Sequence, residues 1–164
     1  MNRNRGFTLV ELMVTLVVAA ILLALAIPSF SAMLRKNRAA TDISALTNTI
    51  AYARSEAVAR NKDVCVAASA ANAWNSGWEV RIGGSSCDGA VLRVFPAASA
   101  TATLGVVKDG GAVASFGFTA SGFRLGNESV ITYYAAGTCD PETGRVLTIV
   151  PTGRVTIAAC VAGS

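Results

Sequence analysis

The chain has 164 residues, enough for one compact domain and an additional anchor. It contains no histidine, so the commonest general base and the commonest metal ligand are both missing. Residues 63–164 hold six basic and seven acidic side chains, whereas residues 28–62 hold six basic and two acidic ones. The pI near 9.1 therefore reflects the N-terminal part of the chain and does not indicate a nucleic-acid-binding surface on the rest.

Residues 1–6 (MNRNRG) form a short basic leader, and the residues from Phe7 to Ile27 are nearly all apolar. A run of this length can cross a bilayer as a helix. A cleaved secretory signal usually has a shorter apolar region that ends at a small-residue cleavage site, and no such site follows closely here. Residues 7–27 are therefore predicted to be a transmembrane helix. Basic side chains flank it on both sides, so the positive-inside rule does not settle its orientation.

Glu11 lies near the start of this apolar run. A carboxylate inside hydrocarbon costs roughly 2.5 kcal/mol or more, and such a residue usually has a partner. One interpretation is that Glu11 forms an ion pair within the membrane boundary. The alternative is that its side chain reaches the headgroups, because it is close to the helix start.

A second helical segment follows the anchor. Pro28 is predicted to end or kink the helix, because it lacks an N–H group and clashes with the preceding turn. Helical periodicity then continues, which predicts an amphipathic stem over residues 28–62 and one long helix from about Phe7 to Arg60. The apolar stripe of the stem consists of Ile43, Leu46, Ile50, Ala53 and Ala57. The opposite, polar side carries Asp42, Asn48, Arg54 and Arg60. Arg54 and Glu56 could either pair across to the sheet or lie on a solvated face.

Residues 63–164 have the pattern of a β-rich domain. Short runs of β-branched and aromatic residues alternate with Gly, Asn, Asp and Pro turn signals such as Asp109-Gly110-Gly111. The predicted strands are 64–68, 77–82, 91–95, 113–118, 129–135, 145–150 and 154–160. Their spacing predicts antiparallel meanders. The expected fold class is α+β, with a long N-terminal helix, half transmembrane and half amphipathic, packed on an antiparallel sheet domain.

Four cysteines occur at positions 65, 87, 139 and 160, all after the apolar segment. If that segment crosses a membrane outward, they lie in an oxidising compartment and form two disulfides. The sequence permits three connectivities. We favour Cys65–Cys87 and Cys139–Cys160 because each pair closes a local loop, and buried free thiols are the alternative.

Other polar and aromatic clusters give no catalytic or cofactor-binding site. Asp140 and Glu142 lie in a turn and provide too few oxygens for calcium. Trp74 and Trp78 predict a hairpin with one ring in the core, the alternative being a recognition platform. With no histidine, no zinc-ligand spacing and no nucleophile beside a base, we expect no enzyme, no metal and no cofactor.

The segment Gly6-Phe7-Thr8-Leu9-Val10-Glu11, between a basic leader and a long apolar run, resembles the class III signal of type IV pilins and pseudopilins. Residues 45–61 (ALTNTIAYARSEAVARN) and 74–82 (WNSGWEVRI) resemble the GspH/FimT family of minor pilins and pseudopilins, as does the terminal stretch 152–157 (TGRVTI). The resemblance implies a pilin-like fold.

The resemblance also implies a maturation step. A prepilin peptidase would cut after Gly6 and methylate the new amino group of Phe7. The helix from Phe7 would remain as a single span among the lipids of the inner membrane, with residues 63–164 in the periplasm until assembly into a filament. Glu11 could then meet its own or a neighbour's amine, because an ion pair in low dielectric leaves neither charge isolated.

The implied function is that of a minor pilin that helps initiate and cap a type IV pilus at or near its tip, in pilus biogenesis and twitching motility. Its implied partners are other minor pilins, the major pilin, the prepilin peptidase and the inner-membrane assembly platform. One alternative is the H-type minor pseudopilin of type II secretion, which would have other pseudopilins as partners.

A second alternative is a tip receptor for DNA. Some family members bind DNA through a Gly-Arg-x-Arg element, and here Gly153 and Arg154 fit, but Thr156 replaces the second arginine. Arg145 and Arg124 would have to join Arg154 in space to form a DNA contact. With few phosphate contacts, the affinity would be low and would fall steeply with salt.

Overall fold

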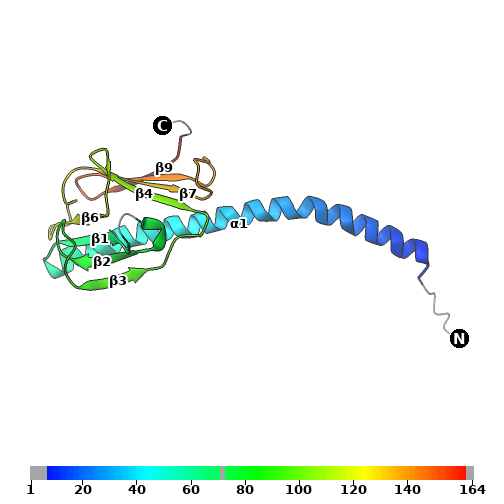
Figure 1. Cartoon of the computed structure of the whole chain (residues 1–164), viewed down its shortest axis with the longest axis horizontal. Helices are drawn as coiled ribbons and strands as arrows, with labels where there is room; N and C mark the ends of the chain where they lie inside the picture. Colours follow the sequence, from blue (N-terminus) through cyan, green and yellow to red (C-terminus); the bar gives the residue numbers. More distant parts are fainter. Residues whose placement is uncertain (1–6, 71–72, 162–164) are drawn as a thin grey trace. The chain divides into compact units, whose positions relative to one another are not determined.

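The computed structural model describes residues 7–70 and 73–161, without the side chains of residues 25–28. The predicted leader, residues 1–6, lies outside the described residues. The chain divides into two compact units, Met1–Arg35 and Lys36–Ser164. The helix α1 (Leu9–Arg60) contributes its first part to one unit and its second part to the other (Figure 1).

Capping interactions define both ends of α1. At the start, the Glu11 backbone N–H donates to Thr8 Oγ1 at 3.2 Å, so that Thr8 acts as the N-cap. At the end, Asn61 has a φ of 50°, its N–H donates to the carbonyl of Val58, and the Lys62 N–H donates to the carbonyl of Ala57. This pair of hydrogen bonds is a Schellman motif, which explains why the helix ends at Arg60.

Pro28 lies inside α1, and the backbone on both sides of it is helical. Of the two outcomes predicted for this residue, the helix ending is therefore wrong. A kink at Pro28 stays a prediction.

In the unit Lys36–Ser164 the strands form two antiparallel sheets. The first has the order β3-β2-β1-β6 and the second the order β5-β4-β7-β8-β9. The strands are β1 (Val64–Ala68), β2 (Trp78–Ile82), β3 (Val91–Phe95), β4 (Thr103–Lys108), β5 (Gly111–Ala112), β6 (Ser115–Phe118), β7 (Ser129–Tyr134), β8 (Arg145–Ile149) and β9 (Val155–Ala159). A short 3-10 helix, Trp74–Ser76, precedes β2.

The predicted strands are all present, but two strands and the strand order were not predicted. In the sequence, the hairpin of β4 and β5 lies between β3 and β6, but it belongs to the second sheet. β6 then returns to the first sheet and pairs with β1. β4 pairs with β7, and β5 and β6 lie between them in the sequence. The sheets are therefore not simple meanders, although the α+β fold class is confirmed.

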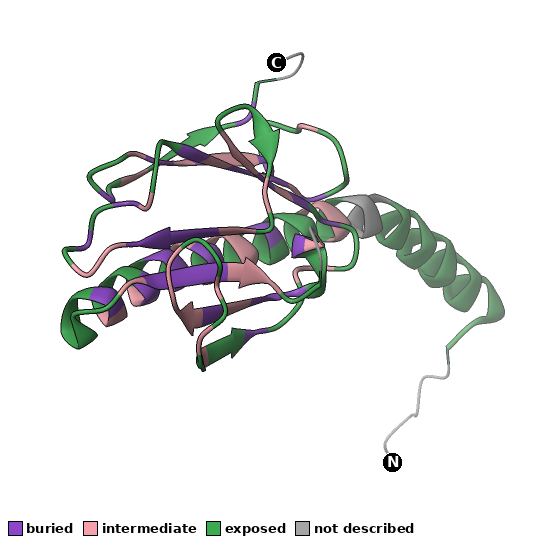
Figure 2. Ribbon diagram, turned by 60° about the vertical axis from the view of Figure 1, so that its left-hand side comes forward, coloured by how far each residue is buried: buried purple, intermediate pink, exposed green. Residues whose placement is uncertain are grey.

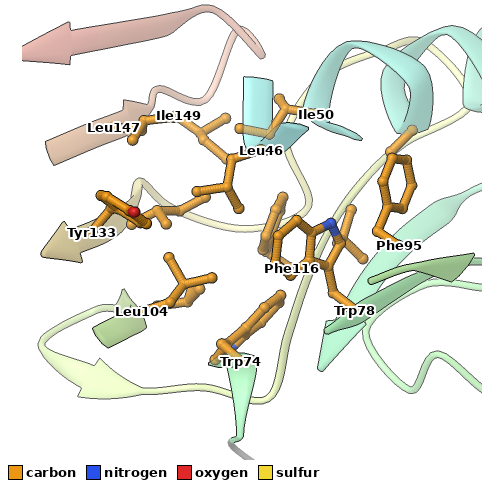
Figure 3. Packing of buried hydrophobic residues seen from close by; sticks show 14 of the residues in the cluster. Leu46, Ile50, Trp74, Trp78, Phe95, Leu104, Phe116, Tyr133, Leu147 and Ile149 are labelled. Atoms are coloured by element: carbon orange, nitrogen blue, oxygen red, sulfur yellow. The ribbon is translucent and has the colours of Figure 1, made fainter. Parts of the chain in front are cut away.

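The core of this unit lies between the second part of α1 and the sheets. Leu46 and Ile50 of α1 pack near Trp78, Leu147 and Ile149 (Figure 3). Of the predicted apolar stripe, Leu46, Ile50, Ala53 and Ala57 are buried and Ile43 is partly buried. The amphipathic character predicted for the stem is thus confirmed, and Figure 2 shows buried residues alternating with exposed ones along this part of the helix.

Both tryptophan rings are buried, whereas the sequence predicted one. Trp78 Nε1 donates to Thr49 Oγ1 at 2.9 Å, and Trp74 Nε1 donates to the carbonyl of Val113 at 2.9 Å. Each indole therefore has the hydrogen-bond partner that a buried N–H group needs. Neither ring forms a recognition platform.

Asp42 was predicted on the polar side of the stem, opposite the apolar stripe, and it is half-buried. Its Oδ2 accepts a hydrogen bond from the Tyr133 hydroxyl at 2.7 Å and another from the Ser99 backbone N–H at 3.1 Å. Asp42 therefore connects α1 to β7 and to the segment that follows β3. Burial, followed by the hydrogen bond to Asp42, raises the pKa of the Tyr133 hydroxyl.

Two disulfides are present, Cys65–Cys87 and Cys139–Cys160, with Cα–Cα distances of 5.7 and 5.8 Å. The first ties β1 to the loop after β2, and the second ties the end of β9 to the loop between β7 and β8. Each therefore fastens a loop to the sheet domain.

Candidate functional site

The first turn of α1 carries the residues to which the sequence assigns maturation and assembly. Phe7 immediately precedes the N-cap Thr8 and is 76% exposed. Glu11 is exposed in the first turn, where the helix dipole favours a carboxylate. Among the described residues, no cation pairs with the Glu11 side chain. Gly6 lies outside the described residues, so cleavage and methylation at Gly6–Phe7 stay predictions.

The part of α1 that follows is an apolar helix with no burial in its own unit. Every described side chain from Phe7 to Ala24 is exposed (Figure 2). Within the described residues, α1 is the one helix long and apolar enough to cross a membrane, with a mean hydropathy of 2.8 over its most apolar window. A helix that is apolar on all sides needs lipid or other helices around it.

The three arginines considered for DNA binding do not form one surface. Arg154 is exposed in the turn between β8 and β9. Arg145 pairs with Ala159 at the opposite end of the same hairpin, roughly 17 Å from Arg154 along the strand. Arg124 is buried. The DNA-receptor hypothesis therefore gains no support from the arrangement of these side chains.

Arg124 instead has a structural role. Its guanidinium donates hydrogen bonds to the carbonyl of Leu125 and to Ser129 Oγ, and its Cζ lies 6.0 Å from the centre of the Phe116 ring. Burial lowers the pKa of this guanidinium, and the charge of Asp109 partly opposes the effect. Because both terminal nitrogens of its guanidinium donate to these partners, Arg124 is not available to bind a phosphate.

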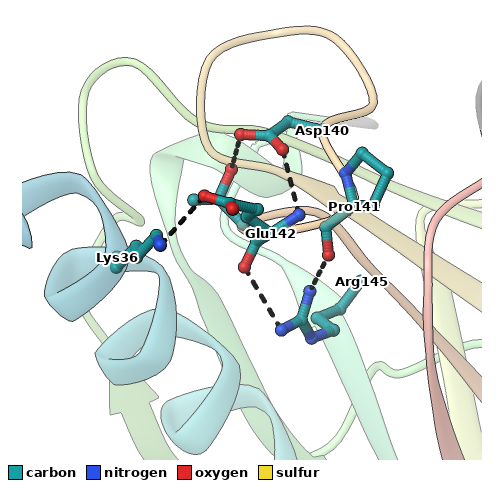
Figure 4. Close-up of polar contacts among 6 residues, drawn as sticks. Lys36, Asp140, Pro141, Glu142 and Arg145 are labelled. Carbon is teal, nitrogen blue, oxygen red and sulfur yellow. Dashed lines mark hydrogen bonds and ion pairs between the residues drawn. The ribbon is translucent and has the colours of Figure 1, made fainter. Parts of the chain in front are cut away.

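The loop between β7 and β8 is built around Asp140. Its carboxylate accepts hydrogen bonds from the Glu142 backbone N–H at 2.9 Å and from Thr143 Oγ1 at 3.0 Å (Figure 4). Glu142 extends to Lys36 of α1, with Nζ and Oε2 2.9 Å apart. Arg145 donates to the carbonyls of Pro141 and Glu142. Asp140 thus closes the turn and Glu142 connects it to α1. The described residues contain no cluster of His, Cys, Asp and Glu suited to a metal ion.

A groove of about 650 Å³ lies between the last turns of α1 and the turn that joins β8 to β9. Its lining is mostly apolar and includes two cationic side chains, Arg54 and Arg154. Arg54 Nη1 donates to the carbonyl of Gly153 at 3.2 Å. This stem groove, defined by Ile50, Arg54, Val58, Gly153, Arg154 and Val155, was not predicted from the sequence.

Comparison with known proteins identifies the family. Residues 42–153, more than half of the chain, match the family model described as Type II transport protein GspH. The chain belongs to the GspH family. Residues 1–27 of this GspH-family chain also match the Prokaryotic N-terminal methylation motif.

Solved structures of family relatives have the same fold. The type IV minor pilin FimU of Pseudomonas aeruginosa strain PAO1 is similar at 27% identity and a TM-score of 0.63, over 74% of this chain and 88% of that one. A second crystal form of FimU gives 27% identity and a TM-score of 0.59, over 71% and 90%.

A more distant structure is the minor pseudopilin EpsH from the Type 2 Secretion System of Vibrio cholerae. It has 13% identity and a TM-score of 0.52, over 71% of this chain and 94% of that one, and at this identity it shows the fold alone. The search of curated proteins gave no match.

These findings make the GspH-family chain a structural protein of the minor pilin and pseudopilin type, not an enzyme. Its N-terminal signal and its apolar helix fit a membrane-anchored pilin. The sequence singled out Glu11 and Phe7 directly but missed the stem groove. The groove combines residues of α1 with a turn about a hundred positions later, and no local sequence pattern predicts such a contact.

Proposed function

We propose that this protein is a minor pilin that helps initiate and cap assembly of a type IV pilus, at or near its tip. The observation that carries the proposal is the combination of an N-terminal methylation motif with a domain similar to the minor pilin FimU at 27% identity. In this proposal, residues 1–6 are removed, residues 7–27 span the inner membrane, and residues 28–62 form the stem. Residues 63–164 then lie in the periplasm, an oxidising compartment that suits the two disulfides.

Assembly is proposed to depend on Glu11. Cutting after Gly6 would free the amine of Phe7, and methylation would keep that amine positively charged. Glu11 is in the first turn of α1 and Phe7 just precedes its N-cap, so the carboxylate of one subunit can meet the amine of its own or of a neighbouring chain. In low dielectric such a pair removes two isolated charges at once. The exposed apolar side chains from Leu9 to Leu23 would pack among the helices of other minor pilins and the major pilin, after delivery through the assembly platform.

The variant Glu11→Gln tests this role, because it removes the charge and keeps the shape. We expect the variant to be cleaved by the prepilin peptidase but to be nearly absent from sheared filaments. Glu142→Gln is the matched control, since Glu142 is an exposed carboxylate far along the sequence. Normal amounts of Glu11→Gln in the filaments would refute the proposed ion pair.

A second candidate function is that of the H-type minor pseudopilin in type II secretion. The description of the matching family model, Type II transport protein GspH, favours it. Deletion of the gene separates the two functions. If the protein is a minor pilin, the deletion strain should lose pili and twitching but export proteins normally. If it is a pseudopilin, the strain should lose protein export but keep normal pili.

A further inference from the structure

The stem groove has the chemistry of a binding site for a side chain that is apolar with a carboxylate beside it. Ile50, Val58 and Val155 provide aliphatic walls. Val58 is 54% exposed although it adjoins the buried core residue Ala57. A concave apolar surface with a few polar groups at its edge is the usual form of a recognition site.

The charges at the edge of the groove have no acidic partner among the described residues. Arg54 uses one of its N–H donors on the carbonyl of Gly153 and keeps the others available. The Arg154 side chain is exposed and has no hydrogen bond or ion pair within the described part of the chain. The ion pairs found there involve other cations, Lys36, Arg60 and Arg81, and no carboxylate lines the groove.

The backbone around Arg54 is shaped for close approach. Gly122 and Gly153 have φ values of 78° and 77°, which favour glycine. A Cβ atom on Gly122 would lie 3.0 Å from Val58 Cγ2, and one on Gly153 would lie 3.1 Å from Arg54 Nε. The two glycines thus let the backbone pack directly against the arginine, which holds its guanidinium at the edge of the groove.

We propose that the stem groove binds a segment of a neighbouring subunit of the same filament, in which an aliphatic or aromatic side chain lies next to an Asp or Glu. The apolar side chain would fill the space beside Val58 and Val155, and the carboxylate would pair with Arg54 and Arg154. This inference rests on the proposed function, because it requires a filament. Nucleic acid is a poorer occupant, since the walls are apolar and the groove has only two cationic lining residues, Arg54 and Arg154.

Site-specific photocrosslinking in cells that make the full-length protein tests the inference. The photoreactive residue p-benzoylphenylalanine is placed at Val58, in the groove, or at Val94, which is 61% exposed on β3 and serves as the surface control. A third probe at Val17, 59% exposed on the apolar part of α1, reports filament assembly separately. We expect the Val58 probe to crosslink to another pilin-type subunit, within about four residues of an Asp or Glu.

Charge reversal provides the decisive comparison. Arg54→Glu combined with Arg154→Glu should lower the yield from the Val58 probe on the order of ten-fold, while Arg154→Lys should largely preserve it. The yields from Val94 and Val17 should not change. The inference is overturned if the Val58 probe captures DNA or lipid, if the captured segment has no carboxylate, or if charge reversal has no effect. If the Val17 probe gives crosslinks and the Val58 probe gives none, the binding role of the groove is rejected and the proposed function stands. If the Val17 probe gives no crosslinks, the proposed function itself is rejected.

Discussion

The hydrogen bonds of Asp42 are predicted to hold the stem helix on the sheet domain. The Asp42 carboxylate accepts from the Tyr133 hydroxyl at 2.7 Å and from the Ser99 N–H at 3.1 Å, and Tyr133 has no exposed surface. A hydrogen bond to a charged group contributes about 1.5–3 kcal/mol. Asp42→Ala also leaves the buried Tyr133 hydroxyl without its partner, so we expect a loss of roughly 3 kcal/mol in the free energy of unfolding.

A double-mutant cycle isolates the bond between the two side chains. Tyr133→Phe removes the hydroxyl but leaves the Ser99 bond to Asp42 in place, and should cost about 1.5 kcal/mol. Once Asp42 is alanine, Tyr133→Phe should cost little or be neutral, because the hydroxyl no longer has an acceptor. The expected coupling energy is therefore at least about 1 kcal/mol.

Urea unfolding of the full-length protein in detergent micelles measures these values. The chain has two tryptophans, Trp74 and Trp78, and both are buried in the sheet domain, so their fluorescence reports the unfolding of this domain. Asp88→Ala is the control, because Asp88 is an exposed acid on a loop. If Asp42→Ala shifts the urea midpoint no more than Asp88→Ala does, or if the two substitutions in the cycle are additive, Asp42 does not act as described.

The raised pKa of Tyr133 predicts a loss of stability at alkaline pH. The unfolded chain loses the phenolic proton near pH 10, whereas the folded chain retains it. The free energy of unfolding should therefore fall above pH 10, by roughly 1 kcal/mol at pH 11. Urea midpoints between pH 8 and pH 11 should show this loss in the natural chain and less of it in Tyr133→Phe, and equal slopes would contradict the assignment. Removal of one disulfide with Cys139→Ser and Cys160→Ser opens a loop of 21 residues and should cost about 3 kcal/mol. An unchanged urea midpoint under non-reducing conditions would show that this disulfide does not stabilise the domain.

Local patterns in the sequence predicted those parts of the fold that depend on local physics. The apolar run after Phe7 is long enough to cross a membrane as a helix, and the stripe through Leu46 and Ile50 repeats with helical spacing. Neither signal needs knowledge of distant residues. The strands predicted after residue 63 follow from β-branched runs between turn signals. Phe7 and Glu11, the residues proposed to act in maturation and assembly, could likewise be identified from the sequence, because the motif that contains them is contiguous.

The remaining features depend on contacts between distant parts of the chain. β4 was missed because Gly105 interrupts its run of strand-forming residues. The segment is a strand because it pairs with β7. The contact of Asp42 with the sheet domain was not predicted, because its partner Tyr133 lies 91 residues away. Arg124 looked available for phosphate, since a charged side chain is seldom buried, and only the partners Leu125 and Ser129 show why it is.

The stem groove illustrates the same limit for function. For Arg54 the sequence left contact with the sheet or a solvated face open, and Arg154 was considered only as part of a DNA-binding pair. In the folded chain both line an apolar groove that neither segment forms by itself.

The central claim is that this chain becomes a filament subunit through its N-terminal segment. The most direct test is the intact mass of the protein recovered from sheared filaments. We predict a mature chain that begins at Phe7, lacks residues 1–6 and carries one added methyl group. Recovery of a chain that retains residues 1–6, or its complete absence from filaments and pseudopilus fractions, would contradict the claim.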